Sequence, residues 1–115
     1  MTVPEEEKTY LDRNVYLDMR HSTIVNDGFM VQFSQTEFLI LKCLVEFIGK
    51  PVKTEEIIKY TWGEDHVFDK SQLYVYITQI RKKLEEKPRS PKYLISKWGF
   101  GYVLRPTGLA PVNWT

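Results

Sequence analysis

Hydrophobic residues recur at helical spacing along residues 69–87, DKSQLYVYITQIRKKLEEK. At about 100° per residue, Leu73, Ile77, Ile80 and Leu84 share one narrow stripe of such a helix. The opposite face collects hydrogen-bonding groups, cations and a small apolar surface. It comprises Ser71, Tyr74, Val75, Thr78, Arg81 and Lys82, with Gln79 and Lys83 on its flanks. The pattern predicts a helix over residues 70–87 with one buried face. The other face suits a DNA groove or, alternatively, is the solvated side of an ordinary surface helix.

The ends of this helix carry their own signals. Asp69 and Gln72 form an Asp-x-x-Gln variant of the capping box, in which each side chain satisfies a free backbone N–H. Pro88 cannot continue the hydrogen-bond ladder, so we expect the helix to end by about Lys87.

Short apolar runs separated by polar turns fill residues 10–33. The runs VYL, TIV and FMVQF predict three or four short antiparallel strands, and Asn26-Asp27-Gly28 is a hairpin signal. We therefore expect an N-terminal sheet with one packed face. Residues 1–9 are short of hydrophobic side chains, and we expect them to be a disordered linker remnant.

Two more helices are predicted between this sheet and the basic helix. Ser34 and Glu37 form a capping box that opens the first, and Gly49 ends it. The second follows Val52 and begins at Lys53 or Thr54, where Lys53 would be a poor cap. The first helix has an apolar side made of Phe38, Leu41, Leu44, Val45 and Ile48.

A hairpin is predicted after Pro88. The run YLISK alternates like a strand, and YVL continues as its partner. Between them Gly99 and Gly101 supply the backbone freedom of a tight turn. We expect this hairpin to span residues 94–104 and residues 106–115 to form a flexible tail.

Charge divides the chain into two unlike parts. The formal net charge is +1 at pH 7, but residues 1–69 hold seven Lys/Arg against thirteen Asp/Glu, a net of −6. Residues 70–105 hold nine Lys/Arg against two Asp/Glu, a net of +7. A polyanion would therefore meet the C-terminal part, where phosphate contacts provide salt-dependent affinity. The alternative is a domain that is dipolar and inert.

Several function classes are disfavoured. A length of 115 residues fits one globular domain, and no apolar run reaches the roughly 18 residues that a membrane span needs. The chain is therefore expected to be soluble and cytoplasmic. Cys43 lies in an apolar run, where a buried thiol is expected. His21 and His66 have no partner spacing for a metal or a catalytic triad, so we expect no enzyme activity, metal or cofactor.

Three helices, the last one basic, followed by a glycine-tipped hairpin describe an α+β winged helix-turn-helix over residues 10–105. Its parts are the N-terminal antiparallel sheet, the three helices and a C-terminal β-hairpin wing. The residues from 33 to 104 resemble the effector domain of OmpR/PhoB-type response regulators, the transcription factors of bacterial two-component systems. The segment PRSPKYLISKWGFGY is similar to the KdpE branch. The matching motifs are Thr36-Glu37-Phe38-x-x-Leu41, Gly49-Lys50, Trp62-Gly63, Ile77-x-x-Ile80-Arg81-Lys82-Lys83-Leu84-Glu85, Ile95-Ser96 and Gly99-Phe100-Gly101-Tyr102.

The resemblance implies roles for individual residues, with the third helix in the major groove and the wing at the minor groove. Phosphate anchors are implied at Trp62, Ser71, Gln72, Thr78, Arg81, Ser96 and Tyr102. Base-edge contacts are implied among Tyr74, Val75, Gln79 and Lys82, where Val75 suits a thymine methyl and Gln79 suits adenine. Trp62 and Tyr102 have an equally common alternative as core or rim aromatics.

This chain departs from the family pattern at four of these positions. Ser71 and Gln79 replace frequent arginines, Tyr74 replaces an acid, and Trp98 replaces the wing arginine. These departures leave the preferred DNA sequence open. Lys97 is a candidate phosphate contact that replaces the wing charge, and Trp98 packs on sugar or on the domain itself.

The resemblance also implies partners. These are double-stranded DNA, a second copy bound head to tail on direct repeats, and RNA polymerase through residues 63–70. A phosphate-accepting receiver domain has no room in 115 residues. The chain is thus expected to be an excised effector domain or a regulator controlled in another way. The rival function is a winged helix that binds proteins through its acidic half and does not bind DNA.

Overall fold

Four short strands form an antiparallel sheet at the start of the chain. The computed structural model describes residues 4–67 and 69–107. The strands are β1 (Lys8–Asp12), β2 (Val15–Asp18), β3 (Thr23–Asn26) and β4 (Phe29–Gln32), in the order β1-β2-β3-β4. The predicted hairpin turn is present, since Asp27 and Gly28 have positive φ values of 50° and 88°.

The expected linker remnant over residues 1–9 reaches too far into the domain. A single turn of 3-10 helix, Glu5–Glu7, precedes β1, and β1 itself begins at Lys8. The Met19 N–H donates to the Glu7 carbonyl at 2.9 Å, so this segment is held by the end of β2. Backbone pairing sets the start of the sheet, which side-chain hydrophobicity did not reveal. Residues 1–3 lie outside the described part.

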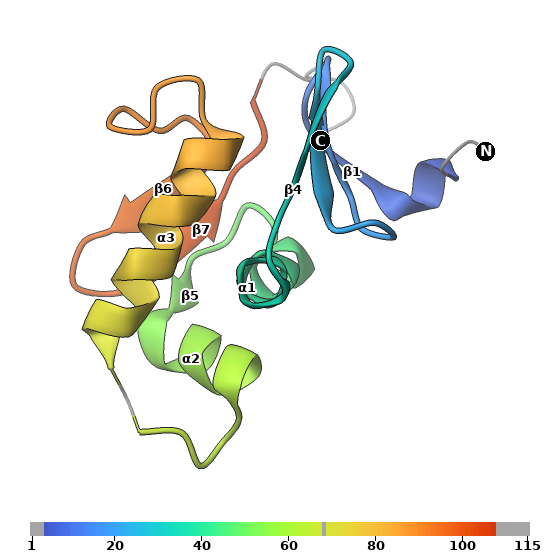
Figure 1. Ribbon diagram of the computed structural model, residues 1–115. Helices are drawn as coiled ribbons and strands as arrows, with labels where there is room; N and C mark the ends of the chain where they lie inside the picture. The colour runs from blue at the N-terminus through green and yellow to red at the C-terminus, as the bar shows by residue number, and fades with distance from the viewer. Residues whose placement is uncertain (1–3, 68, 108–115) are drawn as a thin grey trace.

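Helix α1 (Gln35–Glu46) begins with the predicted capping box. The Ser34 N–H donates to Glu37 Oε1 at 2.8 Å, and the Glu37 N–H donates to Ser34 Oγ at 3.2 Å. Its inner face buries Ile40, Leu41 and Leu44 completely. Figure 1 shows α1 between the N-terminal sheet on one side and α3 with the C-terminal hairpin on the other.

Helix α2 (Thr54–Trp62) has Lys53 at its N-cap. The Lys53 side chain makes no capping hydrogen bond, which agrees with the prediction that it would be a poor cap. The sequence did not reveal β5 (Val52–Lys53), which pairs with β7 (Gly101–Leu104). This pairing brings Gly101 so close to Val52 that a Cβ at residue 101 would overlap the Val52 carbonyl oxygen. A glycine is therefore required where the two strands meet.

Helix α3 (Lys70–Leu84) buries the predicted stripe, with Leu73, Ile77 and Ile80 at 0% exposure. It ends at Leu84, three residues before the predicted Lys87. Glu85 is extended and buried, and its carboxylate accepts the backbone N–H groups of Lys92, Tyr93 and Leu94 at 2.7–3.3 Å. These long-range bonds stop the helix before Pro88 could.

The wing consists of β6 (Leu94–Lys97) and β7, with Gly99 at a φ of 74° in the turn. Together with β5, these two strands form a second sheet in the order β5-β7-β6. The predicted α+β winged helix-turn-helix with its N-terminal sheet is therefore confirmed. Of the expected tail, Thr107 donates its N–H to the Leu11 carbonyl at 2.6 Å. Residues 108–115 lie outside the described part. None of the helices described has both the length and the apolar character to cross a membrane.

Candidate nucleic-acid interface

The face of α3 opposite the buried stripe is open to solvent. Tyr74 is 58% exposed and Val75 is 53% exposed. Ser71, Gln79 and Lys82 are also exposed, and Thr78 is half-buried, with its hydroxyl donating to the Tyr74 carbonyl at 3.0 Å. The residues predicted to contact base edges thus lie together on one exposed surface, which combines an amide, a cation, a phenol and an apolar side chain.

Arg81, which the sequence places on this outward face, binds to the wing. Its Nε and Nη2 donate to the Leu94 carbonyl at 3.0 and 2.9 Å, and Nη2 also donates to Ser96 Oγ at 3.0 Å. The guanidinium lies 6.0 Å from the centre of the Tyr102 ring. Burial raises the pKa of Tyr102, although the nearby Arg81 charge opposes that rise. Arg81, Ser96 and Tyr102 therefore meet where the helix contacts the wing.

Trp62 and Gln72 meet through a histidine to which the sequence assigned no role. Trp62 stacks on His66 with ring centres 5.3 Å apart and lies 5.7 Å from Tyr76. His66 Nε2 is 3.1 Å from Gln72 Oε1. The Gln72 side chain thus bonds His66 and does not complete the predicted capping box. Asp69 fulfils its half, because its carboxylate accepts the N–H groups of Ser71 and Gln72.

Lys83 turns away from the outward face on whose flank the sequence placed it. Its Nζ lies 2.7 Å from Glu37 Oε1 and 3.1 Å from the Gln32 carbonyl. Burial alone would raise the pKa of Glu37, but the bonds from Lys83 and Ser34 lower it. Lys83 is therefore a structural cation, unlike its neighbour Lys82.

The wing presents Lys97 and Trp98 at its turn. Trp98 is 100% exposed, so among the described residues it packs on nothing. A hollow of about 410 Å³ separates the wing from the starts of α2 and α3, and Lys53 and Lys70 line it together with Lys97. Neither Lys53 nor Lys70 was among the residues predicted to contact DNA. The signal for Lys53 was available, since a lysine at an N-cap has no local structural reason.

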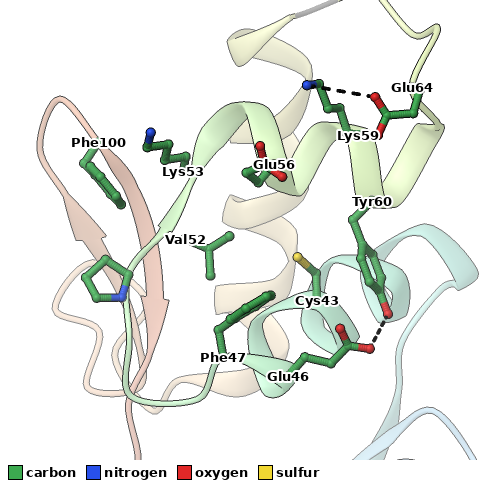
Figure 2. Close-up of a pocket in the computed structure, with 11 residues that line it drawn as sticks. Cys43, Glu46, Phe47, Val52, Lys53, Glu56, Lys59, Tyr60, Glu64 and Phe100 are labelled. Carbon is green, nitrogen blue, oxygen red and sulfur yellow. Dashed lines mark hydrogen bonds and ion pairs between the residues drawn. The ribbon is translucent and has the colours of Figure 1, made fainter.

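Another hollow, of about 470 Å³, lies between α1, α2 and the wing, and none of the predicted site residues lines it (Figure 2). Its charges are mixed. Lys59 lies 3.9 Å from Glu64, and the Tyr60 hydroxyl donates to Glu46 Oε1 at 3.1 Å. Burial raises the pKa of Cys43 to about 11, so at neutral pH this residue is a thiol and not a nucleophilic thiolate. Within residues 4–67 and 69–107, no group of three or more His, Cys, Asp or Glu side chains is placed to hold a metal.

Comparisons with known proteins agree with this geometry. A family model described as "Transcriptional regulatory protein, C terminal" matches residues 28–104. The chain is 35% identical over 86 residues to the transcriptional regulatory protein KdpE of Mycobacterium tuberculosis, covering 75% of this chain and 38% of that protein. The chain thus spans well under half of this relative's length.

Solved structures show the same arrangement. The response regulator DrrB, an OmpR/PhoB homologue of Thermotoga maritima, superposes with a TM-score of 0.71 at 28% identity, covering 80% of this chain and 42% of DrrB. The DNA-binding domain of Klebsiella pneumoniae RstA, solved in complex with the RstA box, shares the fold with a TM-score of 0.75 at 20% identity, covering 87% and 98% of the two chains. Because the family model spans the region from the last strand of the N-terminal sheet to the end of the wing, this chain belongs to the OmpR/PhoB-type family of transcriptional regulatory C-terminal domains.

Proposed function

We propose that this chain binds double-stranded DNA sequence-specifically, as the output domain of a two-component transcriptional regulator. The observation that carries the proposal is the outward face of α3. Its exposed amide, phenol, cation and apolar groups lie on a rigid helix whose other face is fully buried. A helix of this kind fits the major groove of B-DNA, where side chains distinguish base pairs by their donors, acceptors and methyl groups.

The proposed contacts divide into two kinds. Tyr74, Val75, Gln79 and Lys82 read base edges from the centre of the outward face. Phosphates are contacted by hydroxyl, amide and indole donors around it, and the wing reaches the minor groove with Lys97 and Trp98. The proposed phosphate contacts are Trp62, Ser71, Gln72, Thr78, Arg81, Ser96, Lys97 and Tyr102.

Arg81 has two proposed roles, one toward the duplex and one toward the wing. Guanidinium carries five N–H donors, and the bonds to Leu94 and Ser96 leave Nη1 available for a phosphate oxygen. One residue would thus contact the duplex while fixing the wing against the helix.

The relatives support the partner. The DNA-binding domain of RstA was solved in complex with the RstA box and that of AdeR in complex with an intercistronic region, and both share this fold. We extend to this chain a cytoplasmic location, head-to-tail pairing of two copies on direct repeats and contact with RNA polymerase through residues 63–70. Control by a receiver domain elsewhere in a longer regulator belongs to the same proposal.

Titration of labelled duplex at two salt concentrations tests the function. The proposal expects affinity to fall steeply as salt rises, because bound phosphates release counterions. The rival protein-interaction module predicts no salt-sensitive duplex binding. Selection of bound sites from a random duplex pool would then give the preferred sequence, and recovery of no enriched sequence would count against specificity.

A further inference from the structure

Helix α3 from Tyr74 onward and the loop that follows the helix line a hollow of about 860 Å³, which we call the cationic hollow. The loop contributes Lys87 and Arg89 to its lining together with two prolines, and helix α3 contributes Tyr74, Thr78, Arg81 and Lys82. Figure 1 shows this loop in orange, at the end of α3 and beside the wing strands. The hollow therefore adjoins the outward face of α3, and Tyr74 and Lys82 belong to both.

The cations of this hollow have no neutralising partners. Lys82, Lys87 and Arg89 are exposed, and none of them forms an ion pair with another described residue. The two nearest acids along the chain point elsewhere. Glu85 is buried and binds backbone N–H groups, and Glu86 lines a separate hollow beside Asp12 and Asn14. An anion entering the cationic hollow would thus meet these three positive charges together with Arg81, and no carboxylate lines the hollow.

The backbone of the loop that carries Lys87 and Arg89 is fixed before any ligand binds. The Glu85 carboxylate fixes its far end through the N–H groups of residues 92–94, and the Ser90 N–H donates to the Lys87 carbonyl at 2.8 Å. Pro88 and Pro91 restrict the backbone further. A preorganised loop loses little conformational entropy when it binds, so its charges contribute efficiently to affinity.

We propose that the cationic hollow seats a phosphate group of the duplex backbone beside the groove that α3 enters, with Lys87 and Arg89 as its ligands. This inference rests on the proposed function and adds two DNA-contacting residues to it. Lysine and arginine bind phosphate oxygens as charge-assisted donors. The Tyr74 ring and the proline rings offer an apolar wall for the neighbouring sugar. A phosphate carries no sequence information, so the contact raises affinity equally for all duplexes.

The test compares the full chain with the double variant Lys87→Gln, Arg89→Gln by fluorescence anisotropy, using a labelled duplex recovered by selection on the unmodified chain. Because the hollow seats one phosphate, the slope of log affinity against log salt concentration should become shallower by about 0.9 in the double variant. Affinity near physiological salt should fall roughly tenfold, and the ratio of selected to mismatched duplex should not change.

Two further variants make the result decisive. Lys42→Gln, Lys50→Gln removes two exposed cations from α1 and the turn after it and should leave the slope unchanged. Lys87→Arg, Arg89→Lys keeps both charges and should restore the original slope.

The possible outcomes separate this inference from the proposed function. If the unmodified chain binds with a steep slope and the double glutamine variant keeps that slope, the hollow does not seat a phosphate, while the proposed function stands. An equal loss in the Lys42, Lys50 variant would also overturn the inference, because general charge would then explain it. Absence of salt-dependent binding by the unmodified chain would overturn both.

Discussion

Two hollows of the molecule differ in the charges that line them. The hollow of Figure 2 holds lysines and glutamates side by side, and Lys59 lies within 3.9 Å of Glu64. The cationic hollow beside α3 holds lysine and arginine without an acid in its lining. Both are concave, but carboxylates line only the hollow of Figure 2. Charge left unpaired by its own domain is the better indication of where a polyanion binds.

The largest effect is expected at Glu85, which fixes the loop of the cationic hollow. Glu85→Ala would leave the buried N–H groups of Tyr93 and Leu94 and the part-buried N–H of Lys92 without their acceptor, so we expect the free energy of unfolding to fall by about 3 kcal/mol. Urea unfolding monitored by circular dichroism measures this loss. The control Glu86→Ala removes an exposed acid next to it, and its effect should stay within about 0.5 kcal/mol. Similar losses in the two variants would show that Glu85 does not hold the loop.

Within the outward face of α3, Arg81 and Gln79 allow a phosphate contact to be compared with a base contact. Arg81→Ala should weaken binding to every duplex by about tenfold, since it removes a phosphate contact and the bonds to the wing. Gln79→Ala should change the preference at one base pair by about 1–3 kcal/mol and leave other positions alone. Binding measured on a panel of single-base duplex variants separates these patterns. If both substitutions acted alike across the panel, the division between phosphate and base contacts would be wrong.

Lys82 and Lys83 are neighbours in the sequence, but substitution of Lys83 should affect stability, whereas substitution of Lys82 should affect DNA binding. Lys83→Met removes the partner of the buried Glu37 carboxylate and should lower stability by about 1–2 kcal/mol without changing the salt dependence of DNA binding. Lys82→Met should leave stability within about 0.5 kcal/mol and change the preference at the base pair that Lys82 contacts by about 1–3 kcal/mol. Unfolding and salt titration of both variants, with a panel of single-base duplex variants for Lys82→Met, provide the measurement. A shallower salt slope for Lys83→Met would contradict its structural role.

The Lys83 pair also predicts a pH dependence. Because the folded pKa of Glu37 lies below its ordinary value of 4.5, this pair stabilises the protein above pH 4.5, and that stability is lost as the pH falls through the folded pKa. In the Lys83→Met variant, the difference in stability from the original chain should therefore shrink as the pH falls below 4.5. An unchanged difference down to the lowest pH at which the chain stays folded would argue against the pairing.

The smallest effect is expected in the hollow of Figure 2. Lys59 is 47% exposed and its partner Glu64 is 81% exposed, so Lys59→Gln should change stability by less than about 0.5 kcal/mol. The salt dependence of duplex binding should also stay constant. A shallower salt slope for this variant would mean that paired charges contribute to DNA binding as well, and the contrast between the two hollows would lose its meaning.

Local signals in the sequence predicted most of the framework. The Ser34 capping box, the buried stripe of α3 and the glycine turn of the wing each depend on residues close together in the chain. The end of α3 was predicted too late because Pro88 only sets the last possible helical residue. The helix ends earlier because the Glu85 carboxylate accepts backbone N–H groups seven to nine residues further along the chain. Strand β5 was missed because two residues become a strand only by pairing with β7, far along the chain.

The candidate site was predicted in composition but less well in detail. Helical periodicity places Arg81 and Lys83 near the edge of the outward face, and tertiary partners then decide where each side chain points. Arg81 finds the Leu94 carbonyl, and Lys83 finds Glu37. Tyr74 and Gln79 have no such partners among the described residues, which is why the prediction of their exposure holds.

Gly101 lies in close contact with the Val52 carbonyl of β5, so a substitution at Gly101 would change the angle of the wing. Any side chain there would act as a wedge between β5 and β7, while every residue facing the duplex stayed chemically intact. The angle between wing and helix is thereby set at a site that touches neither groove. A substitution at Gly101 alone would therefore change the position of the wing relative to α3.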